Sequence, residues 1–240
     1  MNKMGLTLIY LWLVSLCSCQ QELIEYEKGD IKVCIEQGEQ WLHDFPLFLG
    51  INKKNPPQIA VWLEDTQGNY LSTVYVTHKI ATQSWQASGG NRRKEALPHW
   101  CYSRGVKYDD GLYLPTKKEP LIDGISGATP HESFNIKLNP ATALKKFVVK
   151  IEINHSTDFN EAFPKSAKDG EANYSGGKEG SRQPAIVYAA NVDLSSGEKS
   201  FEANLMGHSS PDGSSGEVNK DTSGLTTALH IVKRITVIIQ

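Results

Sequence analysis

The sequence has little cysteine, no excess of positive charge and no long apolar segment with a helical period. Its 240 residues include four Cys, and 25 Lys and Arg stand against 27 Asp and Glu, for a formal net charge of −2. Binding of nucleic acid needs a basic patch or stripe, and here the basic residues are scattered singly. The charge pattern therefore argues against nucleic acid as a partner, and the missing helical period argues against a helical fold.

Two common kinds of catalytic site are also missing. None of the seven His is paired with another at a metal-binding spacing such as H-x-x-x-H. The segment Gly124 to Ala128 starts like a G-x-S-x-G nucleophile elbow, but Ala128 stands where the second glycine belongs. The loop Gly207 to Glu217 lacks the alternating acidic ligands of a calcium loop. We therefore expect no metal site, no hydrolase triad and no stand-alone catalytic activity.

The N-terminus has the features of a secretory signal. A lysine precedes the apolar run Leu6 to Leu16, which is too short to span a bilayer and ends in small residues. The sequence LCSC that ends at Cys19 resembles a lipobox, where signal peptidase cuts before a lipid-modified cysteine. An ordinary cleaved signal with incidental cysteines is the alternative. The sequence predicts a signal peptide over residues 1–18, lipid attachment at Cys19, a polar tether over 19–28 and a membrane-anchored place in the cell envelope, facing the periplasm or the cell surface.

Strand patterns dominate the rest of the chain, residues 29–240, which we expect to form a single domain. In Phe147 to Ile153, apolar residues alternate with others at period two, so one face belongs to the core and Lys150 faces outward. Similar runs, separated by turn-forming residues, are Gln58 to Glu64, Tyr70 to Thr77, Phe134 to Leu138, Ala185 to Leu194, Phe201 to Leu205 and Ile231 to Ile239.

Short turns between neighbouring runs favour antiparallel pairing. Asp65 to Asn69 and Leu194 to Glu198 each have hairpin length. The pattern predicts an all-β fold, an immunoglobulin-like antiparallel β-sandwich with long loops. In the oxidising cell envelope Cys34 and Cys101 can pair as a disulfide, or they can remain two buried thiols.

The most specific local pattern is DGISGAT at Asp123 to Thr129. It resembles D-x-x-[ST]-G-A-T, the acceptor motif of FAD:protein FMN transferases, in which the last threonine receives FMN through a phosphoester bond. A chance match in a chain of this length is on the order of one in two thousand. The resemblance implies covalent FMN on Thr129, within a site that also includes Asp123, Ser126, Gly127 and Ala128. A glycine-rich tight turn that is kept for its shape is the alternative.

Three segments extend the resemblance over nearly the whole mature chain. Pro57 to Asp65, Asp123 to Pro130 and Gly207 to Leu229 are similar to the predicted periplasmic family called domain of unknown function 2271. Members of that family are secreted β-rich proteins, and relatives of the domain occur beside or fused to flavin transferases. Pro130 departs from the soluble flavin-carrying domains, which continue with an apolar residue into a helix. Their pocket therefore cannot be transferred to this chain.

These observations leave two functions open. The first is a lipid-anchored covalent FMN carrier in extracytoplasmic electron transfer, with a flavin transferase and a redox protein as partners. The second is a cofactor-free binding or structural sandwich at the cell surface. For the flavin carrier, one of four aromatic residues upstream of the motif would stack on the flavin or else cover the core: Trp100, Tyr102, Tyr108 and Tyr113.

Overall fold

The computed structural model describes residues 31–46, 49, 51–85, 92–121, 124–138, 144–177 and 180–240. The predicted signal peptide, the lipid site at Cys19, the tether and Asp123 of the acceptor motif lie outside these residues. Within the described part of the chain, no helix is both long and apolar enough to cross a bilayer.

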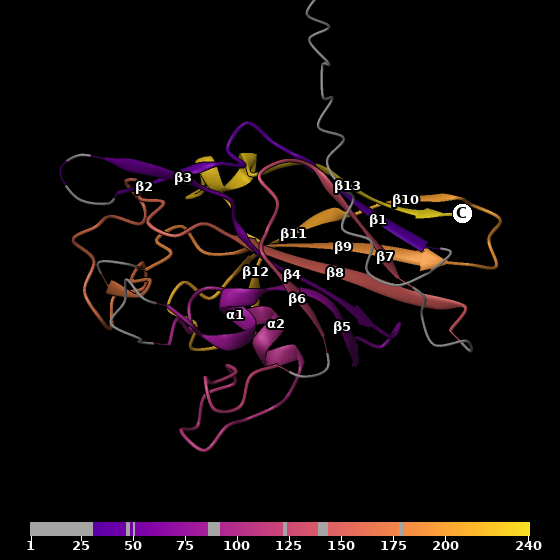
Figure 1. Ribbon diagram of the computed structural model, residues 1–240, viewed down its shortest axis with the longest axis horizontal. Coiled ribbons are helices and arrows are strands. Elements are labelled where there is room, and N and C mark those ends of the chain that lie inside the picture. Colours follow the sequence, from indigo (N-terminus) through magenta and orange to yellow (C-terminus); the bar gives the residue numbers. More distant parts are fainter. Residues whose placement is uncertain are drawn as a thin grey trace, which may run out of the picture.

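The described residues form two large β-sheets and a separate hairpin (Figure 1). The smaller sheet contains, in spatial order, β10 (Ser200–Glu202), β13 (Val232–Ile239), β1 (Ile31–Gln37) and β7 (Phe134–Leu138). The larger sheet contains β12 (Val218–Asn219), β11 (Asn204–Ser209), β9 (Ile186–Asp193), β8 (Lys146–Asn154), β4 (Gln58–Glu64), β5 (Tyr70–Thr77) and β6 (Ile125–Gly127). The hairpin consists of β2 (His43–Pro46) and β3 (Asn52–Asn55).

The predicted all-β sandwich is confirmed, with short helices only. The described helices are α1 (His78–Thr82), α2 (Pro98–Ser103) and the 3-10 turn η2 (Thr227–His230). The two large sheets pair their strands antiparallel, with one exception among the described strands: β6 runs parallel to the end of β5. The immunoglobulin-like strand order remains a prediction.

The main core lies between the two sheets because each contributes one apolar face. On β8, Phe147, Val149, Ile151 and Ile153 are all at most 1% exposed, which confirms the period of two. Opposite them lie the inward residues of the smaller sheet, among them Ile31, Val33 and Ile35 of β1 and Ile235 and Val237 of β13. Each fully buried side chain of this kind contributes about 1.5–3 kcal/mol relative to exposure.

The outer face of the larger sheet is covered as well. Trp62 of β4 and Val76 of β5 pack with Ile80 of α1 and Trp100 of α2 in a second apolar cluster. Figure 1 shows both helices on the side of this sheet that faces away from β1 and β13.

Lys150 is therefore not an outward-facing surface residue. It is 8% exposed, and its Nζ lies 3.5 Å from Oε2 of the buried Glu64. Glu64 also accepts a hydrogen bond of 2.8 Å from Nε1 of Trp62. The expectation that Lys150 faces solvent is wrong, because the alternation of a strand marks two faces without showing what covers the second.

A buried carboxylate fixes α2 to the larger sheet. Glu152 is 0% exposed and accepts hydrogen bonds from the backbone N–H groups of His99, at 3.1 Å, and Trp100, at 2.8 Å. The hydroxyl of Ser209 donates a further bond to it. Burial raises the pKa of Glu152 to about 7, and these three hydrogen bonds oppose the rise. Glu152 thus satisfies the free N–H groups of the first turn of α2.

Cys34 and Cys101 are free thiols in the structure. Cys34 is half-buried in β1, whereas Cys101 is buried in α2 within the second apolar cluster. Burial raises the pKa of both thiols. The disulfide that the sequence allowed is not formed, because the fold assigns the two residues to different packing layers.

Candidate functional site

The acceptor segment lies at an edge of the larger sheet. Its central part forms β6, which pairs with Tyr75, Val76 and Thr77 of β5. The carbonyl oxygen of Gly127 also accepts a hydrogen bond of 3.3 Å from the hydroxyl of Tyr75. Ser126 is exposed on this short strand. No local pattern in the sequence indicates this parallel pairing, which joins segments about 50 residues apart.

Thr129, the predicted attachment residue, is turned inward. It is 5% exposed, and its Oγ1 lies 2.9 Å from Oγ1 of Thr77. The Thr77 hydroxyl in turn accepts a hydrogen bond of 2.9 Å from the backbone N–H of Ile59 on β4. The next residue, Pro130, is held through its carbonyl oxygen, which accepts a bond of 3.1 Å from Nε1 of Trp41. The acceptor hydroxyl is therefore fixed against the central strands of the sheet.

Thr129 lines a pocket of about 620 Å³. The pocket lies between the β2–β3 hairpin, the start of α1 and the acceptor segment, at the end of the sandwich where the hairpin projects in Figure 1. Ala128 also lines it, whereas Ser126 and Gly127 do not. Its other walls are His43, Phe45, Lys53, Asn55, Pro56, Gln58, Thr77, His78, Lys79, Ser84, Trp85, Arg93, His131, His155 and Ser156.

The charge of this pocket is of one sign. Lys53, Lys79 and Arg93 line it, and no Asp or Glu does so among the described residues. Burial of its ammonium group lowers the pKa of Lys79, and the charges of Lys53 and Arg93 lower it further. Arg93 is 5% exposed and is held by Glu95, with Nε to Oε1 at 3.1 Å, and by the hydroxyl of Ser156 at 2.6 Å. The pocket is thus suited to an anion.

A pair of histidine rings forms another part of the wall. The rings of His43 and His155 have centroids 5.2 Å apart. His155 is 3% exposed, and its Nε2 lies 2.8 Å from the carbonyl oxygen of Gln40, which requires the hydrogen on Nε2. Burial lowers the pKa of His155 to about 3, so this ring is neutral near pH 7. Among the described residues no group of His, Cys, Asp and Glu is arranged to hold a metal ion.

Besides Phe45 and the histidines, the aromatic residue of the pocket wall is Trp85, which the sequence did not indicate as a site residue. It is 7% exposed, and the Arg93 guanidinium carbon lies 4.7 Å from its ring centroid, with Lys79 Nζ at 5.6 Å. None of the four aromatic residues expected to stack on flavin lines this pocket: Trp100, Tyr102, Tyr108 and Tyr113. Trp100 is fully buried, and Tyr102 and Tyr113 stack on each other at 4.4 Å. Trp100, Tyr102 and Tyr113 therefore serve packing. Trp85 lines the same pocket as Thr129 because the chain turns after α1.

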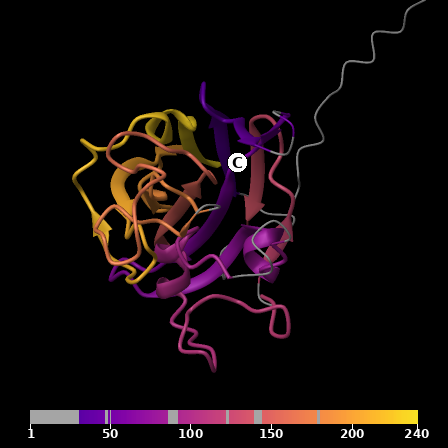
Figure 2. The same cartoon turned by 90° about the vertical axis from the view of Figure 1, so that its left-hand side faces the viewer.

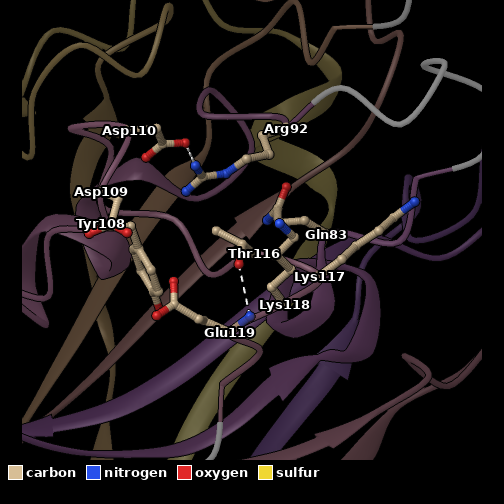
Figure 3. A pocket seen from close by; sticks show the side chains of 9 residues that line it. All are labelled: Gln83, Arg92, Tyr108, Asp109, Asp110, Thr116, Lys117, Lys118 and Glu119. Carbon is tan, nitrogen blue, oxygen red and sulfur yellow. Dashed lines mark hydrogen bonds and ion pairs between the residues drawn. The ribbon is translucent and has the colours of Figure 1, made fainter.

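A second pocket, of about 600 Å³, lies beside the segment that follows α2 (Figure 3). Both overall views show that segment projecting away from the sandwich (Figures 1 and 2). Its charges are of both signs: Arg92 points at Asp110 and forms an ion pair with it, and Lys117, Lys118 and Glu119 also line the wall. It contains Tyr108, one of the four aromatic candidates, but no described residue of the acceptor motif. The Thr129 pocket is therefore the stronger candidate.

Comparison with protein-family models, with curated proteins and with solved structures finds no match to this chain. The resemblance to domain of unknown function 2271 therefore remains a hypothesis that rests on the sequence motifs.

Proposed function

We propose that this protein is a lipid-anchored covalent FMN carrier that takes part in electron transfer in the cell envelope. FMN would be attached to Thr129, and the lipid on Cys19 would hold the protein at the membrane. The observation that carries the proposal is that the last residue of the acceptor-like motif lines a pocket of about 620 Å³ whose charged residues are all basic.

The pocket suits FMN in size and in charge. Small-molecule pockets in proteins have volumes of roughly 300–1,000 Å³. A phosphoester on Thr129 would remain an anion, and Lys53 and Lys79 would neutralise it, whereas the charge of Arg93 is already paired with Glu95. Trp85 offers an aromatic wall for the ring system. The bound flavin would supply the redox chemistry, while these residues would bind and orient it.

Attachment requires a reaction with a second enzyme. The Thr129 hydroxyl oxygen would attack the FMN-side phosphorus of FAD in the transferase, forming the new P–O bond. The diphosphate bond would break, AMP would leave, and the hydroxyl proton would pass to the transferase.

Thr129 must also become accessible, because only 5% of the residue is exposed. The segment before it is held to the sheet by the three-residue strand β6, which pairs with one neighbour, β5. Short edge strands of this kind open at low free-energy cost. We therefore expect the transferase to act on Thr129 while β6 is detached, either during folding or in a local opening.

The test is co-expression of the mature chain with an FAD:protein FMN transferase, followed by intact-mass measurement. The parent should gain the mass of one FMN less one water, and yellow fluorescence should stay attached after denaturation. Thr129→Val should lose both properties, because valine keeps the branched shape without the hydroxyl. Thr129→Ser should keep them.

Ser84→Ala is the matched control, since Ser84 carries a hydroxyl in the wall of the same pocket but lies outside the acceptor motif. It should be modified as the parent is. Circular dichroism must show that each variant is folded. An unmodified parent with active transferase and FAD present would overturn the proposal and favour the cofactor-free binding sandwich.

A further inference from the structure

We infer that the Thr129 pocket is also a reversible binding site for a phosphomonoester carried on an aromatic ring system, with Lys79 as its main charged contact. This inference rests on the pocket alone and does not depend on covalent attachment at Thr129.

Among the residues that the structure describes, two lysines of the pocket lack the compensating charge that Lys54 and Lys146 have. Lys54 on β3 pairs with Asp44 at 3.0 Å, and Lys146 pairs with Asp193 at 2.9 Å. Lys53 and Lys79, which face the pocket, have no such carboxylate partner among the described residues. Like charges held near one another raise the free energy of the folded state, and a bound anion relieves that repulsion.

The positive charge of the pocket comes from different walls. Lys53 belongs to the β2–β3 hairpin, Lys79 to α1 and Arg93 to the segment before α2. Arg93 is fixed by Glu95, Ser156 and Ser181, so its position is set before any ligand binds. An anion with several oxygens can contact such converging groups at once, and phosphate is an anion that lysine and arginine commonly bind.

The pocket is larger than an anion alone requires. About 620 Å³ is much more than a phosphate group fills, and the wall also holds flat or apolar side chains. Trp85, Phe45, Pro56 and the ring of His43 give it surfaces on which an aromatic body can pack. The ligand class is therefore a phosphate on a ring system, of which FMN and AMP are examples.

The experiment titrates the unmodified mature chain, made in cells without a flavin transferase, with FMN, riboflavin, AMP and inorganic phosphate. Flavin fluorescence and calorimetry report the binding. FMN should bind at least ten times more tightly than riboflavin, which lacks the phosphate, and inorganic phosphate should compete with FMN. Binding of AMP would also support a phosphomonoester site, provided that added FMN displaces the bound AMP.

Two lysine substitutions test whether Lys79 is the main charged contact of the ligand. Lys79→Met should weaken FMN binding at least tenfold. Lys54→Met also removes one positive charge, but Lys54 does not line the pocket. This variant should change the affinity for FMN less than twofold. Reversible FMN binding by a parent chain that gains no covalent FMN with active transferase and FAD present would refute the proposed carrier function and leave this inference intact.

Three results would overturn the inference while leaving covalent attachment possible. These are equal binding of FMN and riboflavin, equal effects of Lys79→Met and Lys54→Met, or no binding of any of the four probes. A thermal melt of each variant must match the parent, so that weakened binding is not a consequence of unfolding.

Discussion

Thr129 Oγ1 lies 2.9 Å from Thr77 Oγ1, although the two residues are 52 positions apart in the chain. The Thr77 oxygen also accepts the N–H of Ile59 at 2.9 Å and lies 3.3 Å from the Ile59 carbonyl oxygen. A hydroxyl has one hydrogen, so Thr77 can donate either to Ile59 or to Thr129. An esterified Thr129 oxygen can only accept, and Thr77 would then be its donor.

Thr77 should matter for stability as well as for the position of Thr129. Thr77→Val leaves the buried N–H of Ile59 without its acceptor, so it should lower the free energy of unfolding by about 1–3 kcal/mol. Thr77→Ser keeps the oxygen and should lie closer to the parent. Urea titrations measure both, and equal stability of the valine and serine variants would show that the hydroxyl does not hold β4.

The ion pair of Lys150 with Glu64 predicts a large cost when the lysine is removed. Lys150→Ala leaves a buried carboxylate without its cation and should cost about 3–5 kcal/mol. Lys146→Ala, on the same strand, is the control: the Lys146 side chain is 60% exposed, and losing its pair with Asp193 should cost at most about 1 kcal/mol.

Replacing both partners of the buried pair, as in Lys150→Met with Glu64→Gln, should recover much of the loss, because no unpaired charge remains. Denaturant titrations in which Lys150→Ala costs no more than Lys146→Ala would mean that the outer layer does not enclose Lys150.

Ile151 tests the main core. It is 0% exposed between the two sheets, and Ile151→Ala should lower the free energy of unfolding by about 2–5 kcal/mol through lost burial and a cavity. Ile151→Val removes one methylene group and should cost about 0.5–1.5 kcal/mol. Chemical denaturation gives both values, and an alanine variant as stable as the valine one would contradict this packing.

His155 should make the fold sensitive to acid. The pKa of buried His155 is lowered to about 3, whereas an unfolded histidine titrates near 6.5. Between these values the unfolded chain holds a proton that the folded chain lacks. This contribution to stability is complete above about pH 6.5 and is lost as pH falls towards 3, by at most about 1.4 kcal/mol per pH unit.

His155→Gln can still donate to the Gln40 carbonyl and should show a smaller loss of stability between about pH 6.5 and 4.5. His131→Gln, at an exposed position of the same pocket, should keep the pH dependence of the parent. Denaturant titrations over this pH range compare the three proteins. If the free energy of unfolding falls with pH equally in His155→Gln and in the parent, His155 is not the cause of the acid sensitivity.

Cys19 should determine membrane attachment. Cys19→Ala should release the protein from membranes, because the apolar signal is removed on cleavage and only acyl chains remain to hold the mature chain. Cys17→Ala is the matched control and should leave attachment unchanged. Detergent-phase partitioning measures both, and full retention of the Cys19→Ala protein in the detergent phase would rule out lipid attachment at Cys19.

The sequence by itself determined the β-class of the fold and several strands to the residue. Gln58–Glu64, Tyr70–Thr77 and Phe134–Leu138 have the expected bounds, because alternation and flanking turns are local signals. It also singled out Thr129 from a motif. It did not identify β1, although the strand is central to the smaller sheet, since the chain there follows a segment assigned to the tether.

Only the tertiary structure decided what surrounds those residues. The burial of Lys150, the separation of Cys34 from Cys101 and the pocket formed at Thr129 by Lys79, Trp85 and other walls come from segments far apart in the chain. A strand pattern states that a residue faces one side of a sheet, and a motif states which atoms are present. Neither contains the long-range packing that places a helix or loop over that side, and that packing sets burial, charge and access at the site.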